Sequence, residues 1–342
     1  MGHLQTRLYC RPFHRPLQTH HGMWATREGL MLRWESVPGQ VAFGEIAPIP
    51  WFGTETLEQA QEFCVRFARD ASVAKMRDVP DNLPACQFGL GSMVSTCLGD
   101  LSPTLVDDAG LALAEQPSGR PADITAEAIC ALLPAGKTAV EAWPALWEKG
   151  HRTFKWKIGV ATVEEEWAIF WQLVAALPAT AQLRLDANGG LMPAVAEAWL
   201  AVCDQVPEKV EFVEQPLPPD SILAWLATVR DRFQTPIAVD ESVATLRQLQ
   251  QVHQQLGDQV IYVVKPAIAG FPDQLYDFCT QHHLDVVFSS ALETPIGRDR
   301  VLNLAQRLWA AGLPQRALGF GVGHWFADNW DNLSETAIWE QL

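Results

Sequence analysis

Hydrophobic and polar positions follow one repeating pattern through most of the chain. After about residue 125, short runs of apolar or β-branched residues alternate with longer amphipathic stretches. Such short runs are typical of buried strands, and the longer periodic stretches are typical of helices. We predict strands, with helices between most of them, at residues 128–133, 153–158, 182–186, 210–214, 237–240, 260–265, 285–290 and 317–321.

Eight strands of this kind favour a closed barrel. The region spans about 200 residues, which suits the lower end of the size range of TIM barrels. An open doubly wound sheet is the alternative, and it would usually carry a Gly-rich phosphate turn after an early strand. No such turn follows the early strands of this sequence. We therefore predict an α/β fold built on a (β/α)7β-type TIM barrel.

The first hundred residues have a different pattern. Strand-like pieces at 6–9, 26–34 and 40–45 are separated by turn residues and predict an antiparallel meander. Thr56-Leu-Glu-Gln is a capping-box start for a helix, and residues 87–99 predict a second helix. We predict an α+β capping domain over 1–115, the barrel over 116–322 and a C-terminal segment, 323–342, that returns toward the capping domain. The stretch 100–123, rich in Pro, Gly and Asp, would connect the two domains.

Composition narrows the class of protein. Apolar residues make up 48% and charged residues 19%, as in folded globular chains, and the net charge of −15 disfavours binding to nucleic acid or anionic membranes. The seven cysteines are scattered, without CxxC or zinc spacing. No apolar run approaches the roughly 20 residues that span a bilayer, and the N-terminus lacks a signal-peptide core. We predict a cytoplasmic protein with neither nucleic acid nor membrane as a partner; the oligomeric state stays open, and we favour a monomer.

Candidate chemistry falls at one point in each repeat. Six polar residues each end a predicted strand, at spacings of 24 to 29 residues: Lys157, Asp186, Glu214, Asp240, Lys265 and Ser289. The C-terminal ends of barrel strands form one rim, and active sites of such barrels lie there. We expect these six side chains to converge.

Three of these residues, Asp186, Glu214 and Asp240, offer hard oxygen ligands from consecutive strands. Mg²⁺ prefers carboxylate oxygens and keeps open positions for water and substrate. Three carboxylates packed together without a cation would repel one another and raise one another's pKa. Any one of them alone would more often be a solvated loop residue. Their matched positions favour a site for Mg²⁺, the cofactor that we predict.

Lysines flank the predicted metal site. Lys155 and Lys157 are two apart in a strand and share a face, so a neighbouring ammonium and a metal ion would both disfavour the charge of Lys157 and allow it to act as a base. Lys265 arrives from the other side of the three acids. An isolated strand lysine would more often snorkel to the rim, but Lys265 ends an apolar run, where a charge is costly. The predicted chemistry is removal of a proton beside a metal-bound carboxylate.

At these residues the sequence resembles the enolase superfamily, in its muconate-lactonising-enzyme-like branch. The signature of that branch is Lys-x-Lys, Asp, Glu, Asp and Lys on successive barrel strands. Within the branch, the chain is most similar to the o-succinylbenzoate synthases of menaquinone and phylloquinone biosynthesis. The matching text is Phe-Lys155-Trp-Lys157, Arg184-Leu-Asp186-Ala-Asn188, Val-Glu214-Gln-Pro, Val-Asp240-Glu241-Ser, Val-Lys265-Pro and Ser289-Ser290-Ala-Leu-Glu293-Thr, with Gly44-Glu45 and Ala47-Pro48 in the front domain.

The resemblance implies a magnesium-dependent lyase that acts on a small carboxylate. Its reaction is the syn-dehydration of 2-succinyl-6-hydroxy-2,4-cyclohexadiene-1-carboxylate to o-succinylbenzoate through a metal-stabilised enediolate. Lys157 would take the ring proton and then help the hydroxyl leave, Lys265 would stabilise the opposite face, and Asp186, Glu214 and Asp240 would bind the metal. Strand alternation would let only one of Asp240 and Glu241 point inward, and the resemblance selects Asp240.

Substrate contacts are expected from residues around the same rim. Candidates are Lys155, Arg184, Ser289, Ser290 and Gly321. Arg184 would share the face of Asp186 and could hold a ligand or an acid. Either serine could instead be a hydrogen-bonded strand end. The loops 20–23 and 50–53 of the front domain would close the mouth of the barrel.

Other activities of the superfamily remain open. N-succinylamino-acid racemisation and cycloisomerisation use the same two lysines and the same metal. A dipeptide epimerase would carry Asp-x-Asp at the eighth strand, where this chain has Gly-Phe-Gly, and a mandelate-racemase-like enzyme would replace the Lys265 region with a His–Asp pair. A barrel retained for binding alone is the remaining alternative, which loss of a lysine or an acid would have indicated.

Overall fold

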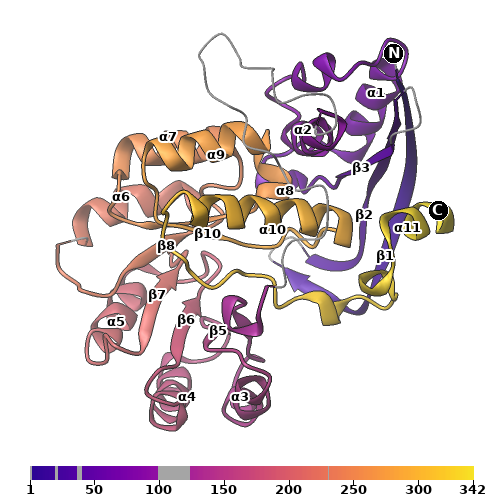
Figure 1. Ribbon diagram of the computed structural model, residues 1–342. Coiled ribbons are helices and arrows are strands. Elements are labelled where there is room, and N and C mark those ends of the chain that lie inside the picture. Colours follow the sequence, from indigo (N-terminus) through magenta and orange to yellow (C-terminus); the bar gives the residue numbers. More distant parts are fainter. Residues whose placement is uncertain (1, 20–21, 37–40, 99–123, 230) are drawn as a thin grey trace.

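The computed structural model describes residues 2–342 except 20–21, 37–40, 99–123 and 230. It has two parts, an antiparallel sheet with its helices and a parallel barrel (Figure 1). The strands are β1 His3–Thr19, β2 Gly22–Glu35, β3 Val41–Ile46, β4 Ala131–Leu132, β5 Thr153–Lys157, β6 Gln182–Asp186, β7 Val210–Glu214, β8 Ile237–Val239, β9 Ile261–Val264 and β10 Val286–Phe288. The α-helices are α1 Leu57–Phe67, α2 Pro84–Leu98, α3 Thr138–Glu148, α4 Val163–Ala176, α5 Pro193–Cys203, α6 Pro219–Val229, α7 Leu246–Leu256, α8 Pro266–Ala269, α9 Pro272–Gln281, α10 Pro295–Ala310 and α11 Glu335–Gln341.

The front sheet is the predicted antiparallel meander, in the order β1-β2-β3. Its first two strands are much longer than we predicted. Strand β1 continues through Pro12 and Pro16, and its pairing with β2 shifts register between Pro12 and Leu17. An edge strand tolerates proline at such an irregularity because its missing N–H leaves no central ladder bond unmade.

A local capping box starts the first helix of the front sheet, and an acid from a distant part of the sequence holds the start of the second. Thr56 caps α1 by accepting from the backbone N–H of Gln59, whose side chain returns to the N–H of Thr56 at 2.8 Å, as the capping box predicted. The second helix begins three residues before the predicted position 87. The buried Glu55 carboxylate accepts the N–H groups of Ala85 and Cys86 at that start, at 3.2 and 2.7 Å. The predicted connection 100–123 and the predicted domain boundary at 115 lie outside the described residues.

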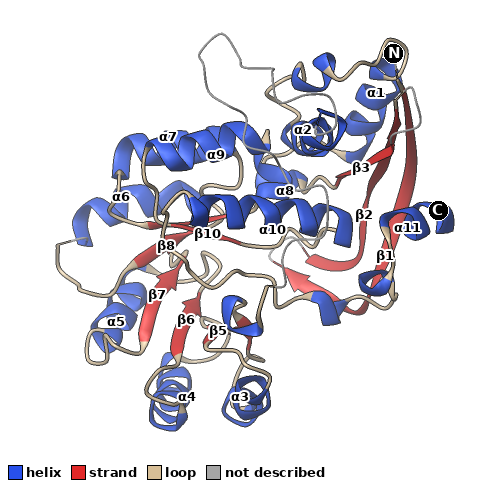
Figure 2. Cartoon of the chain, viewed as in Figure 1, coloured by secondary structure: helices blue, strands red, loops and turns tan. Residues whose placement is uncertain are grey.

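Seven parallel strands, β4 to β10 in sequence order, form the second sheet (Figure 2). Strands β6 and β7 have the predicted bounds. The predicted eighth strand is much shorter than expected, because Leu318 bridges Ile129 and Gly319 bridges Ser289 without a continuous ladder. Since Ile129 precedes β4 and Ser289 follows β10, these two parallel bridges join the edges of the sheet. The predicted barrel is confirmed, with its last strand reduced to bridges.

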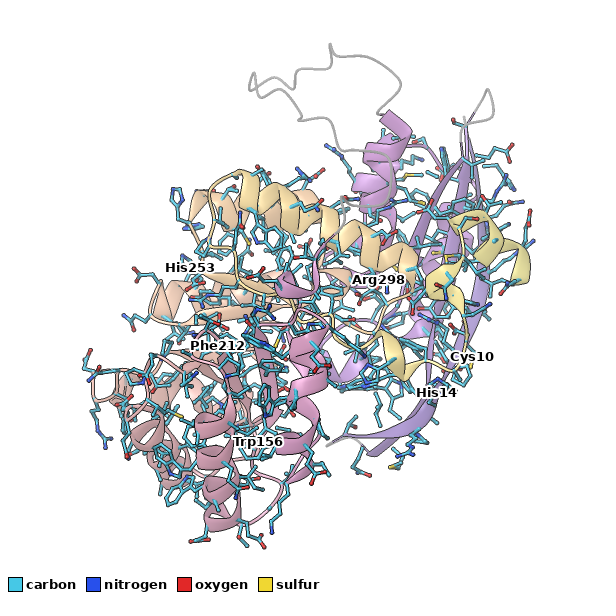
Figure 3. All side chains as sticks on the ribbon, turned by 60° about the horizontal axis from the view of Figure 1, so that its bottom comes forward. Cys10, His14, Trp156, Phe212, His253 and Arg298 are labelled. Carbon is cyan, nitrogen blue, oxygen red and sulfur yellow. The ribbon has the colours of Figure 1, made fainter. Side chains whose placement is uncertain are left out.

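Apolar side chains fill the barrel and leave its rim to polar ones. A separate cluster of buried residues in the barrel consists of Phe212, Ala238, Ile261, Val263 and Val287. Trp156 faces the opposite way, toward Trp199 of α5 (ring centroids 6.4 Å apart), and Figure 3 labels Trp156 and Phe212 in this half of the molecule. The strands therefore present their inward polar residues at their ends.

The last twenty residues lie against the front sheet. The ring of Trp339 in α11 is 6.2 Å from that of Phe43 in β3, and Arg7 of β1 donates to the Trp339 carbonyl at 2.6 Å. Arg298 of α10, labelled in Figure 3, pairs with Asp331 at 2.7 Å. The domain limits at 115 and 322 stay a prediction. None of the helices described here is long and apolar enough to cross a lipid bilayer.

A buried carboxyl at the junction of the two parts makes stability depend on pH. Glu293 accepts from the N–H of Ala291 at 2.6 Å and from the Ser290 hydroxyl at 3.1 Å. Burial, with the nearby charge of Glu45, raises the pKa of Glu293 from 4.5 to about 7. Because the folded state disfavours the charged form, the wild type loses stability through Glu293 as pH rises from about 4.5 to 7.

We predict that Glu293→Gln becomes progressively more stable relative to the wild type over that pH range, since the amide keeps an acceptor and carries no charge. Denaturant unfolding at pH 5, 6, 7 and 8 measures the difference. The exposed Glu340, changed to Gln, is the control and should give a difference that does not vary with pH. Parallel stability curves for wild type and Glu293→Gln would contradict the prediction.

Candidate active site

Polar residues meet where the barrel strands end. Strands β5, β6 and β7 end at Lys157, Asp186 and Glu214, and parallel pairing aligns Lys157 with Asp186 and Asp186 with Glu214. Asp240 follows β8 and Lys265 follows β9. Because the strands are parallel and in register, these five side chains start from one rim of the barrel.

Two lysines neutralise part of the acidic charge at this rim. The Lys155 ammonium lies 2.7 Å from an oxygen of Asp186 and 3.0 Å from one of Glu214. The Lys265 ammonium forms an ion pair with Asp240. Glu214 is 1% exposed and the two aspartates are almost as deeply buried. Each of the three acids therefore lies in contact with a cationic side chain.

Lys155 and Lys265 do not supply enough positive charge to balance the buried carboxylates at the rim. Burial, together with Asp186, raises the pKa of Glu214 to about 8. Burial also opposes the charge of Lys155, but the surrounding acids outweigh it and raise the pKa of Lys155 well above its usual range. Lys155 in turn lowers the pKa of Asp186 against the effect of burial. Lys155 thus carries a fixed positive charge, while Glu214 lacks enough positive charge nearby to ionise easily.

The donor chemistry of these acids fits a hard divalent cation. Asp186, Glu214 and Asp240 supply carboxylate oxygens, the ligands that Mg²⁺ prefers, and the raised pKa of Glu214 marks a charge that a cation would relieve. Within the described part of the chain, no three acidic, His or Cys side chains are gathered closely enough to hold a metal as they stand. The carboxylates form ion pairs with Lys155 and Lys265 instead.

Glu241 is a buried acid that our sequence argument set aside. We expected strand alternation to turn it away from Asp240, but β8 ends at Val239, so alternation does not govern this pair. One oxygen of Glu241 accepts from the Asn188 amide at 3.3 Å, and the other is buried without a hydrogen-bond partner among the described residues. Burial and Asp240 raise the pKa of Glu241 to about 7. The rim therefore holds a fourth carboxylate.

Lys157 and Lys265 lie on opposite sides of the acids. Their strands, β5 and β9, are separated in the sheet by β6, β7 and β8, which carry or precede Asp186, Glu214 and Asp240. Lys157 is half-buried and makes no side-chain hydrogen bond to any residue that the structure describes. Lys157 is thus available to a molecule bound at the mouth of the barrel.

The front sheet reaches the rim through a short turn. The 3₁₀ turn Pro50–Phe52 places the Phe52 ring 4.9 Å from the Lys265 ammonium. The sequence predicted that the loop 50–53 would reach the mouth, but the hydrophobic pattern gave no reason to select Phe52. Part of the other predicted loop, residues 20–21, lies outside the described residues, and Met23 at its end is exposed.

Of the two roles expected for Arg184, holding a ligand or holding an acid, the structure shows the second. Its guanidinium donates to Glu211 at 2.7 and 3.2 Å and to the Ala317 carbonyl at 2.7 Å. Arg316 joins this group by pairing with Glu211 at 2.6 Å and with Asp285. Glu211 lies near the start of β7 and Asp285 precedes β10, so Arg184 binds at the amino-terminal ends of the strands, away from the rim. Sharing a face with Asp186 does not bring a long side chain to the same end of the barrel.

Ser289, Ser290 and Gly321 lie at the closing edge of the barrel. The Ser290 hydroxyl accepts from the N–H of Leu292 at 2.9 Å and donates to Glu293 at 3.1 Å. A Cβ at Gly321 would lie 2.7 Å from the Cys130 carbonyl, so glycine permits the close approach of two strands there. Ser290 therefore stabilises its own loop. Contact of Ser289, Ser290 and Gly321 with substrate stays a prediction.

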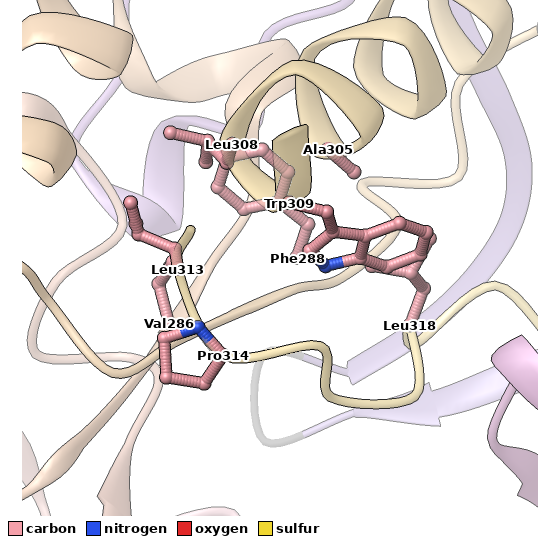
Figure 4. Close-up of a pocket in the computed structure, with 8 residues that line it drawn as sticks. All are labelled: Val286, Phe288, Ala305, Leu308, Trp309, Leu313, Pro314 and Leu318. Atoms are coloured by element: carbon pink, nitrogen blue, oxygen red, sulfur yellow. The ribbon is translucent and has the colours of Figure 1, made fainter. Parts of the chain in front are cut away.

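A small cavity lies elsewhere in the barrel wall. It has a volume of about 10 Å³, and its apolar lining comes from the region between β10 and α10 (Figure 4): Val286, Phe288, Ala305, Leu308, Trp309, Leu313, Pro314 and Leu318. Such a volume holds about one water molecule at most, and the lining offers that water few polar partners. The cavity therefore carries no candidate site.

Comparisons with known proteins agree with this geometry. The family model described as enolase C-terminal domain-like matches residues 138–320, and the model described as MenC, N-terminal domain matches residues 4–98. The o-succinylbenzoate synthase of Thermosynechococcus vestitus is 40% identical over 326 residues, which cover 94% of this chain and 92% of that protein.

Solved structures extend the comparison to the fold. A crystal structure of o-succinylbenzoate synthase from Thermosynechococcus elongatus BP-1, complexed with Mg in the active site, is 36% identical and superposes with a TM-score of 0.85, covering 99% of this chain and 100% of that one. The L-Ala-D/L-Glu epimerase of Bacillus subtilis shares the fold at 19% identity, with a TM-score of 0.69 and coverage of 95% and 90%. The chain therefore belongs to the enolase superfamily and, within it, to the o-succinylbenzoate synthase family.

Proposed function

We propose that this protein is an o-succinylbenzoate synthase. It would remove water from 2-succinyl-6-hydroxy-2,4-cyclohexadiene-1-carboxylate to form o-succinylbenzoate, with Mg²⁺ as its cofactor. The observation that carries the proposal is a pair of lysines, Lys157 and Lys265, on opposite sides of a buried group of carboxylates. Such a pair fits abstraction of a proton next to a carboxylate, and the 40% identical relative carries the name of this dehydratase.

Asp186, Glu214 and Asp240 are the proposed metal ligands. When bound, the metal would supply positive charge that stabilises the charge developing on the substrate carboxylate. Gln215 supports this arrangement, because its side-chain oxygen accepts the N–H of Asp240 at 2.9 Å. The solved relative from T. elongatus is described with Mg in its active site, which supports the same cofactor here.

Lys157 is the proposed acid and base. Its uncharged amine takes the proton from the ring carbon that bears the carboxylate, and the resulting ammonium returns that proton to the departing hydroxyl, which leaves as water. One lysine can serve both steps when the proton and the hydroxyl leave from the same face. Lys155 stays charged between Asp186 and Glu214, and it keeps those two carboxylates in place.

Lys265 is proposed to stabilise the other face of the substrate by its charge. Its ammonium is held by Asp240 and lies beside the Phe52 ring. An ammonium over an aromatic face is attracted by the ring quadrupole, and a product ring could offer a similar face. Substrate contacts through Lys155, Ser289, Ser290 and Gly321 remain part of the proposal.

We predict that Lys157→Arg lowers kcat for the diene carboxylate by about 10²- to 10⁴-fold, the usual contribution of a general base. Arginine is a long basic side chain like lysine but does not release its proton in proteins, so it cannot provide the uncharged amine that acts as base. The measurement is the rate of aromatic product formation, alongside Lys157→Ala as the full truncation. Magnesium affinity should change little, because the lysine is not a ligand.

Lys75→Ala is the control for loss of a lysine, because Lys75 is exposed and pairs with Asp70 far from the rim. This variant should keep wild-type rates. Undiminished turnover by Lys157→Ala would refute the assignment of the base.

Metal dependence is a separate prediction. We expect EDTA to abolish activity and Mg²⁺ to restore it. Negative charge develops on the substrate, and the protein carboxylates, which are themselves negative, cannot stabilise it without a cation. Glu214→Gln should weaken magnesium binding, measured by calorimetry without substrate, whereas Glu340→Gln at the surface should not. Turnover that persists in EDTA would refute the metal assignment.

The assay also distinguishes the proposed activity from its alternatives. Incubation with an N-succinylamino acid in deuterated water would reveal racemisation through exchange at the α-carbon. Exchange in the absence of dehydration would favour the racemase. The absence of both exchange and dehydration would favour a binding role. A cytoplasmic location and a monomeric state are further proposals, and sedimentation would measure the oligomeric state.

A further inference from the structure

The loop that follows β10, residues 289–294, is held by the front sheet. Glu45 of β3 is 1% exposed and accepts several hydrogen bonds there. Its carboxylate accepts the N–H of Thr294 at 2.9 Å, the Thr294 hydroxyl at 2.5 Å and the N–H of Gly297 at 3.1 Å. The Tyr9 hydroxyl also donates to it, at 2.5 Å. A single carboxylate of the front sheet is thus saturated largely by barrel donors.

These donors lie at the start of helix α10. Thr294 occupies the N-cap position, but its side chain makes no capping hydrogen bond, and its hydroxyl donates to Glu45. The first turn of α10 contains no acidic residue. A carboxylate is favoured at a helix N-terminus by the free N–H groups and the helix dipole. Glu45 therefore caps a barrel helix from another part of the fold.

Other charged residues of the front sheet hold the same loop. Arg27 donates to the Ala291 carbonyl at 3.1 Å while it also donates to the Pro48 carbonyl at 2.8 Å. Leu292 has a φ of +60°, in the left-handed region that costs strain for a residue with a side chain. A strained backbone persists where surrounding contacts enforce it. The shape of this loop therefore depends on the front sheet.

The loop connects Glu45 to the rim of the barrel. Thr294 follows Glu293, which accepts from the Ser290 hydroxyl, and Ser290 follows Ser289. Ser289 packs closely against Gly319, where a Cβ would lie 2.6 Å from the serine oxygen. A shift of Thr294 would thus move the two serines relative to the closing edge of the barrel.

We propose that Glu45 is a positioning residue, which sets the Ser289–Ser290 edge of the substrate site by holding the start of α10. The inference rests on the proposed function and adds a residue outside the barrel to it. The proposed base and metal ligands lie on β5 to β7 or directly after β8, whereas this loop follows β10. Loss of Glu45 should consequently weaken substrate binding more than it slows the proton transfer.

The test is steady-state dehydration by Glu45→Gln, with circular dichroism to verify folding. Gln keeps the size of Glu but removes the charge, and its amide group would face donors. We expect KM to rise about tenfold or more, a loss of about 1.4 kcal/mol in binding, while kcat stays within about threefold. Magnesium affinity, measured without substrate, should match that of the wild type.

Two further variants make the result decisive. Thr294→Val removes one donor to Glu45 without touching the front sheet, and it should raise KM in the same direction by a smaller factor. Glu335→Gln is the matched control, because Glu335 joins α11 to Arg300 of α10 at 2.7 Å and makes no hydrogen bond to residues 289–294 in the described part of the chain. It should leave both constants unchanged.

The outcomes separate this inference from the function on which it rests. A wild type that does not dehydrate the diene refutes the proposed function, and the inference with it. An active wild type with unchanged KM in Glu45→Gln refutes the inference alone. Equal losses in kcat and magnesium affinity would also refute it, since they indicate a general structural role. If Glu45→Gln does not fold, Thr294→Val decides: a raised KM supports the inference and an unchanged KM overturns it.

Discussion

The need to balance buried negative charge governs the arrangement of this molecule. Parallel register places Asp186 beside Glu214 at the ends of adjacent strands, and Asp240 follows on the next. Charges removed from water must be paired, because the low dielectric interior offers no other compensation. Lys155 and Lys265 provide part of that pairing. The raised pKa of Glu214 indicates that positive charge is still lacking beside it. The chemistry proposed for the site starts from this imbalance.

Positive charge at the rim is divided among residues with different freedom. Lys155 contacts two acids and Lys265 contacts one, whereas Lys157 has no hydrogen-bonded partner among the described residues. A fixed ammonium can orient carboxylates, but a group that must gain and lose a proton needs room to move. The lysine proposed as base is therefore the one that the acids do not immobilise.

Sequence reasoning succeeded where short-range patterns control structure. Strands β6 and β7 and the Thr56 cap followed from apolar runs and turn residues, and the strand ends located the five polar residues of the rim. It failed where distant contacts decide. Arg184 lies on the expected face, but Glu211 and Ala317 draw its guanidinium to the other end of the barrel. Glu241 was set aside because we expected strand alternation to turn it outward, but β8 ends at Val239, one residue before the predicted end, so alternation does not apply there.

The ion pairs of Arg184 and Arg316 limit the routes by which substrate can enter and product can leave the barrel. With Glu211 and Asp285 they fill the lower end with paired charges, and the apolar cluster around Phe212 lies between them and the rim. A molecule at the rim therefore has a closed base beneath it. Substrate would enter, and both the aromatic product and the released water would depart, past Phe52 and its neighbours in the front sheet. Turnover would then depend on the space that the front sheet leaves beside Phe52.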